Sequence, residues 1–181
     1  MTHNPRPART PRKAPQAPPL DHPSQRRLPP LLRAAWFGLN QAFRRRIHDT
    51  GLTPDQFTLL RWVHECAALS PELGSTHAPT QSELTALMAS DANTIASLLK
   101  RMEGTGLVTR TPDPSDRRAN RIRLTPKGRR TYEKAREVAV ALQAEVLTAL
   151  PDGEREQFLA QLDAVAQACR DASCRSTNPA K

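Results

Sequence analysis

Residues 80–124 decide the fold, and they read TQSELTALMASDANTIASLLKRMEGTGLVTRTPDPSDRRANRIRL. Thr80, with a glutamate three residues later, forms a capping-box pattern that predicts the start of a short helix. A tight turn follows, and either Ser90 or Asp91 suits the N-cap of the next helix. That second helix carries an amphipathic stripe at i, i+3, i+4 and i+7, made by Ile95, Leu98, Leu99 and Met102. Two short helices joined by a tight turn predict a helix-turn-helix.

The rest of the stretch predicts a β-hairpin with a long basic tip. Residues 107–110 and 121–124 have the composition of short strands, and the second of them alternates polar and apolar side chains. Between them, residues 111–116 are rich in proline, aspartate and serine, which favour turns. We therefore expect a mainly α-helical fold with a small β-hairpin wing, which is a winged helix-turn-helix.

Further helices are expected on both sides of this stretch. Apolar residues at helical spacing predict a helix over 31–48, which Gly51 ends, and another over about 54–69. Thr125–Pro126 predicts the start of a long helix, and Pro151–Gly153 separates that helix from a last one. In the first helix of the helix-turn-helix, the inward side chains are predicted to be Leu84, Leu87 and Met88.

The charge of the chain is strongly basic and unevenly placed. The 181 residues carry a net charge of +9, and the sequence pI is about 10.5. Residues 100–130 hold ten basic and three acidic residues, a local charge of +7, which suits an anionic partner such as nucleic acid. Residues 1–30 hold six basic residues, one acidic residue and many prolines, which predicts a disordered or polyproline II tail. That tail either holds DNA loosely or has no specific role.

The polar side of the second short helix carries candidate DNA contacts. Because its apolar stripe faces the core, short polar and basic side chains remain outside, where they can reach base edges and phosphates. In the hairpin tip, Arg117 and Arg118 suit a narrow minor groove, and Asp116 suits the role of orienting their guanidinium groups. An ordinary solvated helix face and an exposed charged turn are the alternatives. The predicted DNA-binding residues are Ser82, Ser90, Asn93, Thr94, Ser97, Lys100, Arg101, Asp116, Arg117 and Arg118.

These motifs resemble those of MarR-type bacterial regulators. Residues 90–103 are similar to the recognition helix of that family, and residues 106–108 to its first wing strand. Residues 113–118, followed by Leu-Thr-x-x-Gly at 124–128, are similar to its wing signature. The resemblance covers residues 31–170. It implies a DNA-binding winged helix at 54–124 and dimerisation helices at 31–50 and 126–170. Residues 171–181 are expected to form a flexible C-terminal tail, because the helical pattern frays from about Asp171 onward.

The resemblance also implies a function. Members of the family are two-fold dimers, so we expect a homodimeric transcription regulator that binds a pseudo-palindromic operator in double-stranded DNA, with Arg118 entering the minor groove. A repressor released by a small aromatic or phenolic effector, or by cysteine oxidation, is implied. The residues that the resemblance assigns to a core or dimer seam are Leu32, Leu39, Phe43, Leu142, Leu147, Leu159, Leu162 and Val165.

Other chemistry has weaker support in the sequence. Trp36, Phe57, Trp62 and His64 are either neighbours of an effector pocket or plain core and surface side chains. Cys66 is either a redox sensor or a buried thiol, and the thiol is favoured. His64 and Cys66 lie two residues apart and diverge on a helix, so no metal and no cofactor are expected. The sequence has no phosphate-binding glycine loop, GxSxG or HExxH motif, so we expect no enzyme.

The cysteines and the length of the apolar runs indicate the compartment, and three rival functions stay open. Three cysteines without regular spacing favour a reducing compartment, and no stretch reaches the ~20 apolar residues of a membrane helix, so a cytoplasmic protein is expected. One rival is a nucleoid-type architectural protein that coats DNA without operator specificity. Another is a winged-helix module that binds an acidic protein. An enzyme of unrecognised type is the third.

Overall fold

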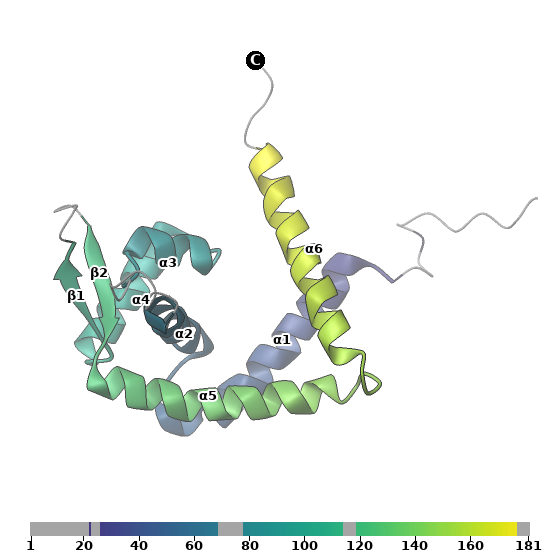
Figure 1. The fold of residues 1–181 in the computed structure, drawn as a ribbon, viewed down its shortest axis with the longest axis horizontal. Coiled ribbons are helices and arrows are strands. Elements are labelled where there is room, and N and C mark those ends of the chain that lie inside the picture. Colours follow the sequence, from purple (N-terminus) through teal and green to yellow (C-terminus); the bar gives the residue numbers. More distant parts are fainter. Residues whose placement is uncertain (1–21, 23–25, 69–77, 114–118, 177–181) are drawn as a thin grey trace, which may run out of the picture. The chain divides into compact units, whose positions relative to one another are not determined.

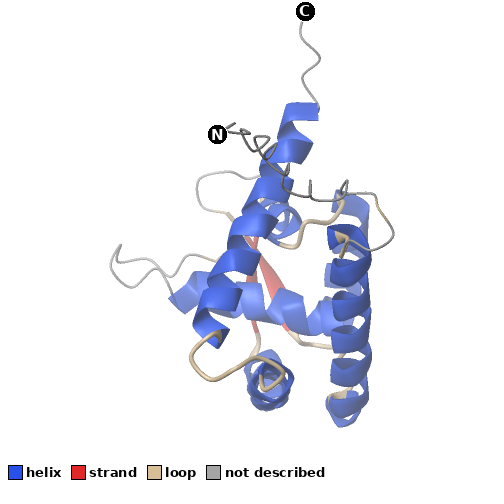
Figure 2. Cartoon of the chain, turned by 90° about the vertical axis from the view of Figure 1, so that its right-hand side faces the viewer, coloured by secondary structure: helices blue, strands red, loops and turns tan. Residues whose placement is uncertain are grey.

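The computed structural model describes residue 22 and residues 26–68, 78–113 and 119–176. The chain divides into two compact units, residues 1–39 and residues 40–181. The described residues form helices and one two-stranded antiparallel sheet (Figures 1 and 2). This confirms the predicted fold class. The elements are α1 Leu28–Arg46, the 3₁₀ helix η1 His48–Thr50, α2 Pro54–Ala68, α3 Gln81–Leu87, α4 Ala92–Gly104, β1 Val108–Pro112, β2 Asn120–Leu124, α5 Pro126–Leu147 and α6 Arg155–Ser176.

The first unit contributes the part of α1 that ends at Leu39. Every described side chain in this unit is exposed, including Leu32, Trp36 and Leu39. Leu32 and Leu39, which the family resemblance assigned to a core or a dimer seam, therefore do not belong to the core of this unit.

The core belongs to the second unit and begins with Phe43 near the end of α1. The Phe43 ring meets Phe57 of α2 edge-on at 4.8 Å between centroids, and Phe57 stacks on Tyr132 of α5 at 5.7 Å. These aromatic pairs join α1 and α2 to α5, which lies much later in the sequence. Leu59, which the sequence pattern did not single out, is completely buried beside them. The apolar stripe of α4 lies in the same core.

The helix-turn-helix forms where the capping pattern predicted it. Thr80 Oγ1 accepts a hydrogen bond from the Glu83 amide at 3.2 Å, while the Thr80 amide donates to Glu83 Oε2 at 2.6 Å. Of the two N-cap candidates for α4, Asp91 is the one that caps it. Leu84 is fully buried, but the prediction that Leu87 faces inward is wrong, because Leu87 is 39% exposed. Leu87 is the last residue of the short helix α3, where the chain turns toward α4.

The hairpin pairs Val108 with Leu124 and Pro112 with Asn120, so both strands extend slightly beyond the predicted ranges. The helix α5 begins at the predicted N-cap, where Thr125 Oγ1 accepts a hydrogen bond from the Gly128 amide at 2.9 Å. At the other end of the chain, α6 continues to Ser176, past the tail boundary that the sequence suggested at residue 171.

Candidate nucleic-acid interface

The helix α4 separates its apolar and polar side chains cleanly. Its apolar stripe is buried, while the polar candidates on the opposite side are exposed. Those exposed candidates are Asn93, Thr94, Ser97, Lys100 and Arg101. A helix with one side anchored in the core and the other covered by hydroxyl, amide and basic groups can enter a DNA major groove.

The first turn of α4 is held by its N-cap. Asp91 Oδ1 accepts from the Thr94 amide at 2.9 Å, and Asp91 Oδ2 accepts from the Thr94 hydroxyl at 2.6 Å. The side-chain hydrogen bond from Thr94, followed by its backbone hydrogen bond, lowers the pKa of Asp91. The Thr94 hydroxyl therefore donates within the protein, and its oxygen can still accept from a ligand. This cap leaves Asn93 and Ser97 to face solvent.

The turn between α3 and α4 sets the angle between the two helices. The Ala89 amide donates to Ala86 O at 3.1 Å, and the Ser90 amide donates to Thr85 O at 3.2 Å, which is the bond pattern of a Schellman turn. Ala89 takes a φ of +47°, which glycine adopts more easily. Of the two serine candidates near this turn, Ser90 is half-buried, and Ser82 on α3 is exposed.

A groove of about 640 Å³ lies between the start of α3 and the hairpin. Gln81, Ser82 and Thr85 line it from α3, and Ala92 lines it from α4. The hairpin side of the groove is lined by Arg110, Asp113, Ala119, Asn120, Arg121 and Ile122. Hydroxyl, amide and guanidinium groups thus surround one open groove, in which the Asp113 carboxylate is paired with Arg121, and such groups suit the phosphates of a nucleic acid backbone.

Of the residues that line this groove, only Ser82 was among the predicted site residues, and sequence reasoning missed the rest, including Arg110, Asp113, Asn120 and Arg121. Arg110 entered as part of the local charge and the first strand, and Arg121 as part of the local charge and the second strand. The strand register pairs Thr111 with Arg121, which brings the guanidinium next to Asp113. The strand alternation was a usable signal, since it marked Arg121 as polar, but the partner became evident only with the register.

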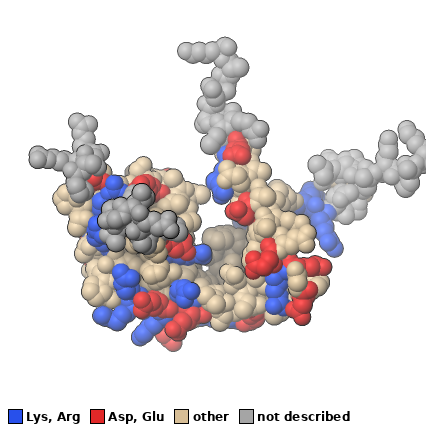
Figure 3. Space-filling model, viewed as in Figure 1, with Lys and Arg blue, Asp and Glu red and all other residues tan. Residues whose placement is uncertain are grey.

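Charges of both signs are interleaved on the surface (Figure 3). On the face shown, blue Lys and Arg side chains alternate with red Asp and Glu side chains. Some of these opposite charges form ion pairs. Arg110 Nε lies 3.3 Å from Glu103 Oε2, and Arg61 Nε lies 2.7 Å from Glu65 Oε1. Part of the positive charge counted from the sequence is therefore already paired within the protein.

The three candidates in the hairpin tip, Asp116, Arg117 and Arg118, lie outside the described residues. Their assignment to the minor groove stays a prediction. The described ends of the tip are tied together, because the Asp113 amide donates to Ala119 O at 3.0 Å.

The aromatic candidates for an effector pocket have different surroundings. Phe57 is a core residue, Trp62 packs partly buried against the core, and Trp36 is 63% exposed. The ring centroids of His64 and Tyr132 are 4.7 Å apart, and His64 lines a small hollow of about 160 Å³ that also involves β2 and α5. Burial raises the pKa of the half-buried Cys66 thiol, with the Glu83 and Glu65 charges adding to the effect, which disfavours a reactive thiolate.

Among the described residues, no group of three or more His, Cys, Asp or Glu side chains is placed to hold a metal ion. Across the same part of the chain, every helix is too short or too polar to cross a membrane.

Known proteins share this arrangement of helix-turn-helix and hairpin. The sequence profile described as MarR family matches residues 52–119. The M. tuberculosis transcriptional regulator MOSR, solved in complex with DNA, is 33% identical, has a TM-score of 0.59, and is matched over 77% of this chain and 96% of its own. The chain belongs to the MarR family.

Other relatives agree with this membership. The repressor CouR, solved with a 23-mer DNA duplex, is 27% identical with a TM-score of 0.65, and the match covers 75% of this chain and 89% of CouR. CouR from Rhodococcus jostii RHA1 is also solved with p-coumaroyl-CoA, at 29% identity and a TM-score of 0.64 over the same shares. The Bacillus subtilis HTH-type transcriptional regulator YsmB is 32% identical over 96 residues. That match spans 53% of this MarR-family chain and 59% of YsmB.

Proposed function

We propose that this MarR-family protein is a sequence-specific transcription regulator that binds a pseudo-palindromic operator as a homodimer in the cytoplasm. The observation that carries the proposal is the exposed polar side of α4 beside an open groove bounded by the hairpin. In this arrangement α4 enters the major groove, and Asn93, Thr94 and Ser97 meet base edges or phosphates. The related proteins MOSR and CouR, both solved with DNA, support the proposal.

The wing contributes the second part of the interface. In the proposal, Arg118 enters the minor groove, Asp116 orients its guanidinium, and Arg117 meets the backbone. Lys100 and Arg101 on α4 and Ser82 on α3 contact phosphates, with Ser90 close to the same backbone. Half-sites of the operator then lie about one helical turn, ~10 bp, apart, because the two recognition helices are related by a two-fold axis.

A homodimer is supported by apolar side chains that the described chain leaves in solvent. In the first unit, Trp36 and Phe37 of α1 are 63% and 64% exposed. In the second unit, Phe158 and Leu162 of α6 are 39% and 38% exposed. Large exposed apolar side chains on helices are typical of protein interfaces, and a two-fold dimer buries the same patch twice.

Repression and its release complete the proposal. A dimer bound near a promoter excludes polymerase, and a small aromatic or phenolic effector releases the dimer by changing the spacing of the two α4 helices. The CouR complex with p-coumaroyl-CoA supports an aromatic effector. The proposal includes no enzymatic activity and no cofactor.

The test is selection of preferred duplexes from random-sequence DNA with the full chain, followed by footprinting on the selected duplex. A two-fold motif with phased protection supports an operator-specific regulator, whereas broad, unphased protection supports the architectural alternative. Arg118→Ala should weaken binding of the selected duplex by at least about tenfold, the scale of one lost charge-assisted contact. The matched control is Arg170→Ala on α6, which removes the same charge and should leave affinity unchanged. Equal affinities for both variants would remove the wing from the interface.

A further inference from the structure

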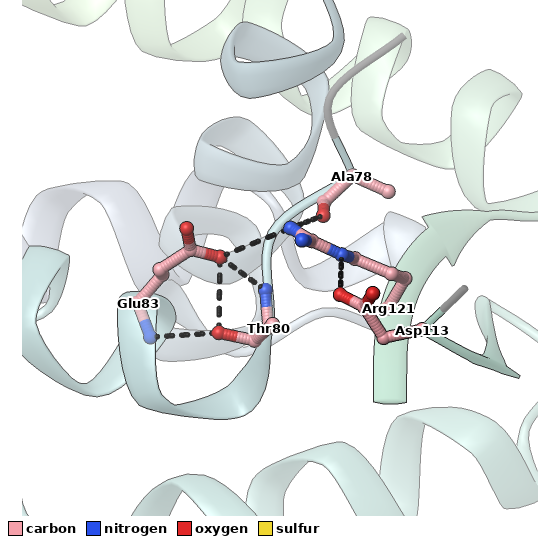
Figure 4. Close-up of polar contacts among 5 residues, drawn as sticks. All are labelled: Ala78, Thr80, Glu83, Asp113 and Arg121. Carbon is pink, nitrogen blue, oxygen red and sulfur yellow. Dashed lines mark hydrogen bonds and ion pairs between the residues drawn. The ribbon is translucent and has the colours of Figure 1, made fainter. Parts of the chain in front are cut away.

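Arg121 on β2 is the meeting point of three acceptors from different parts of the sequence (Figure 4). Its Nε forms an ion pair with Asp113, the residue that follows β1. Its Nη1 donates to Ala78 O at 2.9 Å and lies 3.5 Å from Glu83 Oε2. One side chain therefore links the hairpin, the segment before α3 and the first turn of α3.

The segment before α3 is also joined to β2 by its backbone. Thr80 and Arg121 form an isolated antiparallel bridge, and the Ile122 amide donates to Pro79 O at 2.8 Å. This segment therefore lies along the edge of β2 that β1 does not occupy. The same Glu83 carboxylate that lies near Arg121 also closes the capping box of α3 with Thr80. The start of α3 and the hairpin consequently share one polar cluster.

Of the two acidic members of this cluster, Glu83 and Asp113, the second is only 4% exposed. A buried carboxylate is stable only when it is paired and hydrogen-bonded, since removing it from water is costly. The guanidinium of Arg121, which is itself 23% exposed, supplies that pairing. Because the backbone amide of Asp113 closes the tip against Ala119 at 3.0 Å, the carboxylate lies at the base of the wing tip. The pairing thus acts where the hairpin leaves the body of the protein.

The geometry needs arginine rather than lysine. Two different nitrogens of one planar fork reach acceptors on the hairpin and on the α3 side together. A lysine ammonium has the same charge but a single nitrogen, and it cannot hold that fixed angle between acceptors. The cluster therefore fixes an orientation as well as neutralising a charge.

We propose that the Arg121–Asp113 pair positions the wing relative to the helix-turn-helix, and so sets the distance between the major-groove and wing contacts on the operator. The pair acts through other residues and is a positioning pair rather than a DNA contact. This inference rests on the proposed function of the same interface. Without the pair, the hairpin samples several angles relative to the helix-turn-helix. The apparent affinity for the operator then falls in proportion to the fraction of time that the hairpin spends at the productive angle.

The decisive variant is Asp113→Asn, because two explanations predict opposite signs. If Asp113 were only one more charge near DNA, its removal would tighten binding, since less negative charge faces the phosphates. If Asp113 positions the wing, its removal weakens specific binding despite the more favourable charge. The probe is the duplex selected with the full-length wild-type chain, against a scrambled duplex of equal length. We expect the ratio of specific to non-specific affinity to fall about tenfold.

Matched controls separate this effect from charge and from folding. Glu133→Gln on the exposed side of α5 removes one negative charge and should leave the ratio unchanged. Arg121→Lys should lower the ratio like Asp113→Asn, whereas Arg130→Lys on the exposed side of α5 should not. Loss of folded protein would lower both affinities equally and would leave their ratio unchanged. A thermal melt of each variant shows separately whether the protein is folded.

A spacing test measures positioning directly. One base pair is inserted into the selected duplex between the major-groove contacts and the wing contacts, as mapped by footprinting of the wild-type chain. The wild-type protein should lose affinity steeply on this duplex, and Arg121→Lys should lose less, because a looser wing tolerates the new spacing. Tighter binding by Asp113→Asn, or an unchanged ratio in both folded variants, would overturn the inference. Failure of the wild-type chain to select any duplex would instead overturn the proposed function.

Discussion

A Cβ atom on Gly128 would overlap the carbonyl oxygen of Leu107, so α5 can approach the start of β1 only where it carries glycine. Thr125 completes the junction, because its hydroxyl donates to Gly106 O at 2.6 Å and its amide donates to Leu107 O at 3.1 Å. Lys127 Nζ adds a hydrogen bond of 2.8 Å to Thr105 O. The Leu-Thr-x-x-Gly pattern therefore marks a close contact between the start of α5 and residues 105–107, which join α4 to β1.

Gly128→Ala should destabilise the protein, since the new methyl group meets backbone that cannot rotate away. We expect a loss of about 2 kcal/mol in the free energy of unfolding, measured by urea denaturation. Gly104→Ala is the control, because nothing lies within 4 Å of its added Cβ. That control should be neutral or stabilising by up to ~1 kcal/mol. Equal effects at both glycines would mean that the α5 junction is not tightly packed.

Ala89→Gly should stabilise the turn between α3 and α4. Ala89 has a φ of +47°, and a non-glycine residue in this left-handed region costs ~1–2 kcal/mol, part of which the greater freedom of unfolded glycine offsets. We expect a net gain of about 0.5 kcal/mol in the free energy of unfolding. Ala86→Gly, on the exposed side of α3, should lose ~1 kcal/mol. A loss in both variants would argue against strain at Ala89.

Asn93→Ala and Ser97→Ala should weaken binding of the selected duplex without changing the melting temperature. Both side chains are exposed, so neither contributes to the core, and each lost base contact costs about 1–3 kcal/mol of discrimination. Gln157→Ala on α6 is an exposed polar control. Unchanged binding affinity in both α4 variants would remove this side of α4 from the DNA interface.

The free energy of unfolding at acidic pH should depend on Asp91. Its pKa lies below the ordinary 3.8 because Thr94 donates to the ionised carboxylate. The contribution is therefore complete above the ordinary pKa and is lost as the pH falls through the lowered value. Asp91→Asn still caps the helix but does not titrate. The stability difference between the two proteins should be constant above about pH 5 and shrink at lower pH. A difference that does not vary down to about pH 2 would contradict this role.

Leu162→Glu should convert the proposed homodimer to monomer. The side chain is 38% exposed in the described chain, so a charge there is tolerated by the single chain but not in an apolar seam. Analytical ultracentrifugation measures the change, with Gln161→Glu as a control that adds the same charge at the neighbouring position. A dimer that persists in Leu162→Glu would place the interface elsewhere.

Local chemistry was predictable because it depends on neighbours in sequence. The N-caps at Thr80 and Thr125 and the stripe on α4 needed only spacing and side-chain type, and the structure confirms them. Leu87 shows the limit of such reasoning, because a seven-residue helix has too few positions to define its buried side.

The sequence by itself determined the order of the elements, the polar side of α4 and the resemblance to the MarR family. Each of these follows from residues within a few positions of one another. Only the tertiary structure decided that Arg121 pairs with Asp113 and reaches the start of α3, and why position 128 needs glycine. These contacts depend on strand register and on the approach of distant backbones. The Leu-Thr-x-x-Gly pattern marks position 128 but does not show which backbone it meets.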